Sequence, residues 1–442
     1  MNNKRTKRYK RDMFSTEKND WYKLDLSAIV YPTLQRKDFS SVYRLSVLLK
    51  ENINPEILQQ AVTITMNRFP TYKASMRKGL FWRYLEPNSR PGPYVMEDIS
   101  NPCMPMPFKA NNHYLVRFYY YRNRISLEAH HSLGDGSGGM CVLQTLTAVY
   151  LRLLGHSISN GFFVLDVNST PDPGELEDAY MKYANALVRP PRPGEKAYRI
   201  RGTKEPFYTL NIIDGIMSVA QVYQVAATYH ATITEYLNAV LLYALMQKQN
   251  NEFHLRLRPV KIAMPVNLRR FFPSKTLRNF ITMIYPSIDP RLGTYTFEEI
   301  IKHVHNYMQF YINEKYLRGD ITTNAATQRN PLIRITPLFI KDFVVKSLYS
   351  KIQDHNSSAG LTNMGALKVV DDMKPFIERF DIYMGQPFSR RTNCAIASFE
   401  DILTINFASS IKETDVERLF FRKLIQDGIH VKIESNRITE VI

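Results

Sequence analysis

Apolar residues recur along this chain with two periods, which alternate from its beginning to its end. A helical period predicts helices over residues 55–68, where Asn54-Pro55-Glu56 is a typical start, and over residues 141–154. Strand-like stretches lie between and around these helices, at residues 40–49, 71–76, 80–84, 114–121 and 124–130. The dipeptide Arg122-Asn123 is short enough to join the last two strands as a hairpin.

The second half repeats this mixture. Strand-like stretches fall at residues 208–213, 260–265, 280–285, 361–368, 380–383, 394–399 and 402–407, with a last short strand near the end. Helical patterns fall at residues 175–187, 217–229, 234–249, 296–316, 338–350 and 413–426. Because strands and helices are mixed throughout, we expect an α/β or α+β fold of sheets packed with helices.

Length and turn residues divide the chain into two lobes. A chain of 442 residues exceeds the size at which one core keeps growing. Proline and glycine cluster in residues 171–174 and 190–194, which marks a connection. We therefore predict a flexible basic tail over residues 1–20, an N-terminal lobe over 21–190, a linker over 191–205 and a C-terminal lobe over 206–442.

Charge and cysteine content indicate which partners and which cellular location to expect. The net charge of +17 favours anionic partners, among them nucleic acid, an acidic membrane surface, a phosphate-rich cofactor or an acidic carrier protein. We expect no nucleic acid, because the chain has no zinc-finger spacing, RNP-like strand or continuous basic helix. Three widely separated cysteines favour a reducing, cytoplasmic location.

The distribution of apolar and basic residues also predicts neither a membrane span nor a secretory signal. No apolar run approaches the roughly 18 to 20 residues of a membrane span, so no transmembrane segment is expected. Basic residues crowd positions 4–11, but no apolar stretch follows them, which is unlike a secretory signal.

The candidate chemistry lies at residues 130–136, with the sequence HHSLGDG, where a predicted strand turns into a helix. Alternation along a strand lets only one of His130 and His131 face a given cavity. A neutral imidazole there suits a general base. Asp135 is either a triad partner or a group that serves the fold, and glycines around it permit tight turns. A metal site is disfavoured, because the adjacent histidines diverge and no further ligand has a convincing spacing.

These residues also carry a resemblance. HHxxxDG, together with PVNLR at residues 265–269 and LRNF at 277–280, resembles the chloramphenicol-acetyltransferase-like superfamily of condensation domains, alcohol acetyltransferases and polyketide-associated acyltransferases. The similarity in layout covers almost the whole chain, and stand-alone alcohol acetyltransferases are the closer likeness. The DFGWG sequence of the plant branch is absent, since residues 381–385 share only its ends.

The resemblance implies two similar lobes around a central channel, with His131 as general base and His130, Asp135, Gly136 and Arg269 as structural residues. Asp135 and Arg269 would form a buried salt bridge. Asn363, in a TNMG segment similar to SNLG, and Ser358 would contact the oxyanion or substrate.

The implied activity is direct acyl transfer from acyl-CoA, or from a phosphopantetheine-linked acyl carrier protein, to an alcohol or amine. No metal and no permanently bound cofactor are implied. The alternative is a catalytically inactive, condensation-like domain that binds carrier-linked intermediates or partner proteins.

Overall fold

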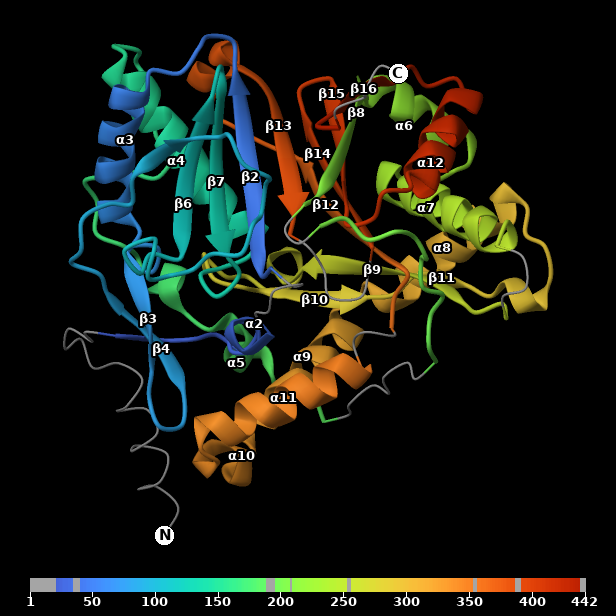
Figure 1. The fold of residues 1–442 in the computed structure, drawn as a ribbon, viewed down its shortest axis with the longest axis horizontal. Coiled ribbons are helices and arrows are strands. Elements are labelled where there is room, and N and C mark those ends of the chain that lie inside the picture. Colours follow the sequence, from blue (N-terminus) through green and yellow to red (C-terminus); the bar gives the residue numbers. More distant parts are fainter. Residues whose placement is uncertain are drawn as a thin grey trace.

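Two β-sheets stand side by side, and each is covered by helices, as Figure 1 shows for this computed structural model. The structure describes residues 21–34, 40–187, 195–206, 209–252, 256–352, 356–385 and 391–437. The basic tail expected at residues 1–20 and the first part of the expected linker, residues 191–194, lie outside the described residues. The expected mixed α/β architecture in two lobes is confirmed.

The first sheet has the strand order β13-β2-β7-β6-β5. Its strands are β2 (Val42–Leu49), β5 (Val95–Glu97), β6 (Val116–Tyr121), β7 (Arg124–His130) and β13 (Ile377–Met384). Helices α3 (Pro55–Arg68) and α4 (Gly136–Leu153) pack against each other beside it. The Asn54 side chain accepts a hydrogen bond from the Ile57 amide at 3.0 Å, so the predicted helix start is confirmed.

The second sheet has the order β10-β9-β12-β14-β15-β8-β16, and β11 also pairs with β9. Its strands are β8 (Asn211–Ser218), β9 (Val260–Asn267), β10 (Ile281–Ile284), β11 (Ser287–Ile288), β12 (Ala359–Ala366), β14 (Thr392–Phe399), β15 (Ile402–Ser409) and β16 (Lys432–Ser435). The helices beside it are α6 (Val219–Thr228), α7 (Ile233–Asn250), α8 (Phe297–Tyr311) and α12 (Asp415–Gln426).

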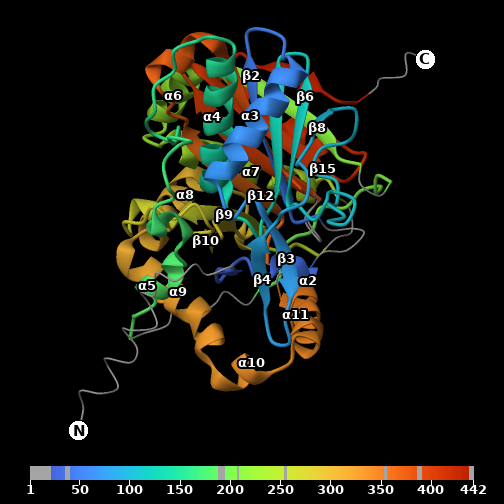
Figure 2. The same ribbon diagram turned by 90° about the vertical axis from the view of Figure 1, so that its left-hand side faces the viewer.

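A third, smaller layer lies beneath both sheets (Figure 2). It contains a three-stranded sheet of order β1-β4-β3, with β1 (Tyr22–Lys23), β3 (Ala74–Lys78) and β4 (Arg83–Pro87). Its helices are α2 (Tyr31–Leu34), α5 (Ala179–Tyr183), α9 (Glu314–Arg329), α10 (Pro331–Ile335) and α11 (Leu338–Ile352). None of the described helices is both long and apolar enough to cross a membrane.

One strand departs from the predicted lobe boundaries. β13 belongs by sequence to the C-terminal lobe, yet it pairs antiparallel with β2 and completes the first sheet. Side chains tie it back to the second sheet, since Thr404 donates a hydrogen bond to the Phe380 carbonyl at 2.8 Å and the Ile382 amide donates to Asn406 at 3.0 Å. β13 is therefore part of the first sheet, although it lies within residues 206–442.

Two predicted helices are also divided. The expected helix over residues 296–316 ends at Tyr311, and α9 begins at Glu314 because the Asn313 side chain caps it by accepting from the Tyr316 amide at 3.0 Å. The expected helix over 175–187 is replaced by a 3₁₀ turn (Pro173–Leu176) and the short α5. Asp178 caps α5 through the Tyr180 amide at 3.2 Å.

The start of α4 is pressed against the loop before β10. A Cβ atom built at Gly138 or at Gly134 would overlap the carbonyl oxygen of Leu277. Backbone therefore meets backbone at this point, which only glycine permits. The contact brings the end of β7 in one lobe next to the loop that precedes β10 in the other.

Replacing Gly138 with alanine tests this contact. Helix propensity alone would favour alanine by about 1 kcal/mol. The overlap with Leu277 predicts instead that Gly138→Ala lowers the free energy of unfolding by about 2 kcal/mol, measured by urea denaturation. Thr63→Ala, on an exposed position of α3, is the control and should change it by less than about 0.5 kcal/mol. A stabilised Gly138→Ala variant would contradict the close approach.

Candidate active site

A cavity of about 1380 Å³ lies between the two sheets and extends into the lower layer. Tyr43 and His131 line it from the first lobe, and Asn267 and Asn363 line it from the second. The volume is larger than that of an ordinary small-molecule pocket. It therefore has room for two substrates at once.

His131 lies directly after β7 and faces this cavity, where it is half-buried. Its backbone amide donates to the Ser41 carbonyl at 2.8 Å, and its carbonyl accepts from the Asn279 side chain at 2.9 Å. The imidazole stacks on Tyr31 with ring centroids 4.8 Å apart, and the Tyr43 ring lies 4.6 Å away on a tilted plane. Backbone and ring are thus both held in place.

The surroundings keep this imidazole neutral. Burial lowers the pKa of His131 to about 4, although the carboxylate of Asp135 and the backbone of Gly134 act in the opposite direction. The Nδ1 atom is shielded from solvent and makes no hydrogen bond of ordinary geometry with any described residue. At neutral pH the side chain is therefore a proton acceptor.

His130 points away from the cavity. It is fully buried, its ring packs edge-on against Phe108 with centroids 5.3 Å apart, and its Nδ1 accepts from the Ser132 amide at 3.3 Å. Burial and then the neighbouring His131 lower the pKa of His130 to about 3. The two rings diverge as strand alternation predicts, and no cluster of three potential metal ligands occurs in the described part of the chain.

Asp135 is turned away from His131 and forms a junction, by which we mean that its carboxylate joins the start of α4 to Arg269 and to the segment before β10. One carboxylate oxygen accepts from the amides of Ser137 and Gly138, at 3.1 and 3.2 Å, and so caps α4. The other accepts from the Phe280 amide at 2.8 Å and pairs with Arg269 at 2.8 Å. The structure therefore brings Asp135 and Arg269 together, as the resemblance implies.

Arg269 is held at its other nitrogens by backbone. Nε donates to the Thr276 carbonyl at 3.0 Å, and Nη2 donates to the Arg278 carbonyl at 2.5 Å. Its guanidinium thus pins the segment before β10 to the start of α4. The helix cap and the pair with Arg269 account for the position of Asp135 without a role as triad partner of His131.

Gly136 forms the first turn of α4 at the cavity wall. A Cβ at this position would lie 3.0 Å from the sulfur of Met364 on β12. Next to it, the Ser137 hydroxyl accepts from the Asn267 side chain at 3.1 Å. Both Gly136 and Ser137 line the cavity beside His131, from a helix N-terminus that favours developing negative charge.

The two predicted oxyanion contacts differ in position. Asn363 lines the cavity, but its amide nitrogen donates to the Thr234 hydroxyl at 2.8 Å and its oxygen accepts from the Gly365 amide at 2.7 Å. Ser358 is buried between β9 and β12, where it exchanges hydrogen bonds with the Lys261 backbone. It is not among the cavity-lining residues, so its predicted substrate contact is not supported.

Comparison with known proteins adds to this geometry. Neither protein-family models nor curated proteins match the sequence. Among solved structures, the chain is similar to TRI101 from F. sporotrichioides, solved with coenzyme A and T-2, at 11% identity and a TM-score of 0.61, over 93% of this chain and 99% of that one.

Two further structures agree. The first condensation domain of the calcium-dependent antibiotic synthetase has 13% identity and a TM-score of 0.60, over 94% of this chain and 100% of that one. Polyketide synthase associated protein 5 from Mycobacterium tuberculosis has 13% identity and a TM-score of 0.57, over 91% and 96%.

The chain has the condensation-domain fold.

Sequence reasoning missed the aromatic pair around the imidazole. In this condensation-domain fold Tyr43 stands on β2 beside β7, and Tyr31 belongs to the short α2, more than ninety residues before the motif. Neither lies in a motif, and only the pairing of β2 with β7 brings Tyr43 to His131. Of the polar pair, Asn267 lies in the PVNLR segment that carries the resemblance, and Ser137 directly follows HHSLGDG.

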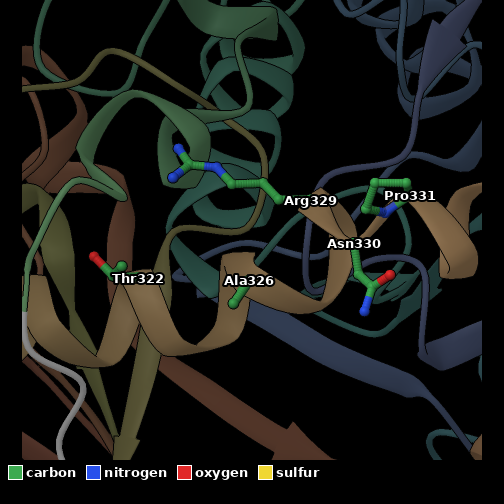
Figure 3. A pocket seen from close by; sticks show the side chains of 5 residues that line it. All are labelled: Thr322, Ala326, Arg329, Asn330 and Pro331. Atoms are coloured by element: carbon green, nitrogen blue, oxygen red, sulfur yellow. The ribbon is translucent and has the colours of Figure 1, made fainter.

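A second, smaller hollow of about 380 Å³ lies along α9 and its junction with α10 (Figure 3). Its walls are Thr322, Ala326, Arg329, Asn330 and Pro331. The Arg329 guanidinium donates to the Ala184 carbonyl at 2.6 Å and so holds α9 to the end of α5. These lining residues include no acid–base pair.

Removing Arg269 tests the role of the Asp135 junction. Because Asp135 is almost fully buried, Arg269→Met leaves a charge without its cation and should lower the free energy of unfolding by about 3 kcal/mol, measured by chemical denaturation. The neighbouring exposed residue gives a matched control, since Arg270→Met should change it by less than about 0.5 kcal/mol. Equal losses in the two variants would contradict a structural ion pair.

Proposed function

We propose that the protein is an acyltransferase that transfers an acyl group from a coenzyme A thioester, or from a phosphopantetheine thioester on a carrier protein, to an alcohol or amine. The observation that carries the proposal is the neutral imidazole of His131, fixed between two tyrosine rings at the wall of the inter-lobe cavity. A base in that state accepts a proton without first losing one.

The reaction needs one proton shuttle. His131 takes the proton from the acceptor hydroxyl or amine as its oxygen or nitrogen attacks the thioester carbonyl carbon. The tetrahedral intermediate then collapses, the carbon–sulfur bond breaks, and the thiolate takes the proton back from the imidazolium. The enzyme ends as it began, with no acyl-enzyme and no resident cofactor in the sequence of steps.

The oxyanion of the intermediate needs hydrogen-bond donors near His131. The Ser137 hydroxyl is one candidate, because it accepts from Asn267 and still has its own proton to donate. The amide of Asn363 has one N–H left after its bond to Thr234, so it stays a second candidate. Ser358 is not proposed.

Structures with this fold support the choice of donor. TRI101 was solved with coenzyme A, and a starter condensation domain of rhizomide synthetase was solved with C8-CoA. Both are only 11–12% identical to this chain, so they support the class of donor and not its acyl group. The net charge of +17 suits a phosphate-rich donor.

Replacing His131 tests the proposed base. With acyl-CoAs of short and long chain and a panel of alcohols and amines, His131→Ala should lower the rate of thiol release by about 10³-fold, because the attacking group keeps its proton. His303→Ala, at an exposed position on α8, is the control and should keep the wild-type rate. Circular dichroism should show both variants folded. Full activity in His131→Ala would overturn the assignment.

The same assay separates catalysis from binding. If the wild-type protein releases no thiol with any donor and acceptor, yet binds an acyl carrier protein tightly, the protein is the binding module of the alternative hypothesis and not an enzyme.

The lowered pKa of His131 predicts the pH dependence. A base is lost when it is protonated, so kcat/KM should fall only as the pH drops through the pKa of about 4. We expect a flat profile from pH 8 to about pH 5.5, where an ordinary histidine of pKa about 6.5 would already be mostly protonated. Intrinsic fluorescence at each pH identifies unfolding. An acid limb centred near pH 6.5 would contradict the lowered pKa of His131.

A further inference from the structure

The lower layer carries an apolar surface, which we call the α11 face. It is formed by the β3–β4 hairpin and by the consecutive helices α10 and α11. It consists of exposed apolar side chains from the tip of the β3–β4 hairpin and from α10 and α11: Leu80, Phe81, Leu332, Ile335, Phe339, Ile340, Phe343 and Val344. The hairpin tip and α11 lie side by side in both ribbon views (Figures 1 and 2). A cluster of this kind on a protein surface marks an interaction site, whereas single exposed apolar residues do not.

Two contacts join the segments into one surface. The Leu338 amide donates to the Leu80 carbonyl at 2.8 Å, and the Lys341 ammonium donates to the Phe81 carbonyl at 3.0 Å. The same ammonium lies 3.5 Å from the centre of the Trp82 ring. The helix and the hairpin tip therefore present their apolar side chains together.

The polarity of α11 is opposite to that of an ordinary surface helix. Two of its charged residues, Lys341 and Asp342, turn toward the rest of the protein: Lys341 contacts the hairpin tip, and Asp342 pairs with Arg83 at 2.5 Å and accepts from Thr33 at 2.8 Å. Phe339 and Phe343, one turn apart, are 73% and 75% exposed. The polar contacts of Lys341 and Asp342 hold α11 in place, whereas Phe339 and Phe343 remain exposed.

The rim of the α11 face is basic. Residues 77–84 and 331–347 contain a single acidic residue, Asp342, which is already paired. Lys78, Arg334 and Lys346 are exposed around the apolar residues. In addition, Trp21 lies edge-on against Tyr84 of β4, with ring centroids 5.9 Å apart, and six lysines and arginines occur at positions 4–11 just before it in sequence.

The α11 face also meets the inter-lobe cavity. Ile340 and Val344 are exposed on this face and line the cavity as well, and Trp82 and Leu338 line it beside them. An apolar molecule at the α11 face is therefore in contact with the wall of the cavity that contains His131.

We propose that the α11 face docks on a membrane surface that carries anionic headgroups. Phe339 and Phe343 enter the boundary between headgroups and acyl chains, and the basic rim contacts the headgroups. Docking is independent of the proposed acyl transfer. The delivery of a lipophilic substrate from the bilayer into the cavity rests on that proposed function.

A second copy of the chain fits this surface less well. A two-fold dimer through the α11 face would place the basic rim of one copy against the same rim of the other, and Asp342, the one acidic residue of residues 77–84 and 331–347, is already paired with Arg83. An anionic bilayer satisfies the apolar residues and the rim together.

Co-sedimentation with vesicles tests the proposal. The full-length protein should bind vesicles of phosphatidylcholine with about one-third phosphatidylglycerol at least about tenfold more tightly than vesicles of phosphatidylcholine alone. Phe339→Ser/Phe343→Ser should weaken binding to the anionic vesicles about tenfold or more, because it removes both apolar anchors. Arg334→Glu/Lys346→Glu should reduce the preference for anionic vesicles.

The control is Phe162→Ser, which removes a phenylalanine of similar exposure, 66%, far from this face in the sequence, and should bind like the wild type. All variants should show an unchanged melting temperature, since the replaced residues are exposed. Wild-type binding by Phe339→Ser/Phe343→Ser would overturn the proposal and leave the basic N-terminal residues as the attachment. No binding by the wild type would overturn it too.

Light scattering without vesicles completes the test. A wild-type dimer that Phe339→Ser/Phe343→Ser converts to a monomer would overturn the proposal in favour of a second copy. Thiol release measured with water-soluble substrates should be equal in the wild type and this variant, so a failure of docking is distinguishable from a failure of the proposed acyl transfer.

Discussion

The carboxylate of Asp135 joins parts of the chain that are far apart in sequence. It caps α4 in the first lobe and, through Arg269 and the Phe280 amide, holds the segment that leads into β10 of the second. Both lobes contribute to the cavity wall next to this point, and the bonds of Asp135 hold the two parts of that wall together. His131 itself is four residues before this carboxylate. Its position relative to the second lobe is therefore fixed by this carboxylate together with the bond from the Asn279 side chain to its own carbonyl.

Much of the fold around His131 could be predicted from the sequence, because the patterns that indicate its strands, helix starts and turns are local. The bounds of β7 match the predicted strand, Asn54 caps the predicted helix, and the strand-to-helix turn at His131 lies where the motif places it. Local patterns failed where a distant partner decides the outcome. β13 joins the first sheet because β2 offers it an edge, and no pattern within residues 377–384 encodes that choice.

The same limit applies to the candidate site. The partner of Asp135 was within reach because PVNLR carries a resemblance, but the rings of Tyr31 and Tyr43 belong to no motif. Ser358 was expected at the substrate and is instead used between β9 and β12, because its register beside Lys261 buries its hydroxyl. A short sequence segment can indicate which role a residue is suited to. The direction in which that residue's side chain points depends on which strand pairs with the segment.

The backbone contact between Gly138 and Leu277 has a consequence for the shape of the cavity. With no side chain between the two lobes at this point, the lobes cannot move closer there, and the bonds of Asp135 keep them from moving apart. The spacing of the two lobes beside His131 is therefore set by this backbone contact together with the Asp135 side chain. A change in the shape of the cavity is then expected from side chains farther along the wall, because the lobes are held at a fixed spacing beside His131.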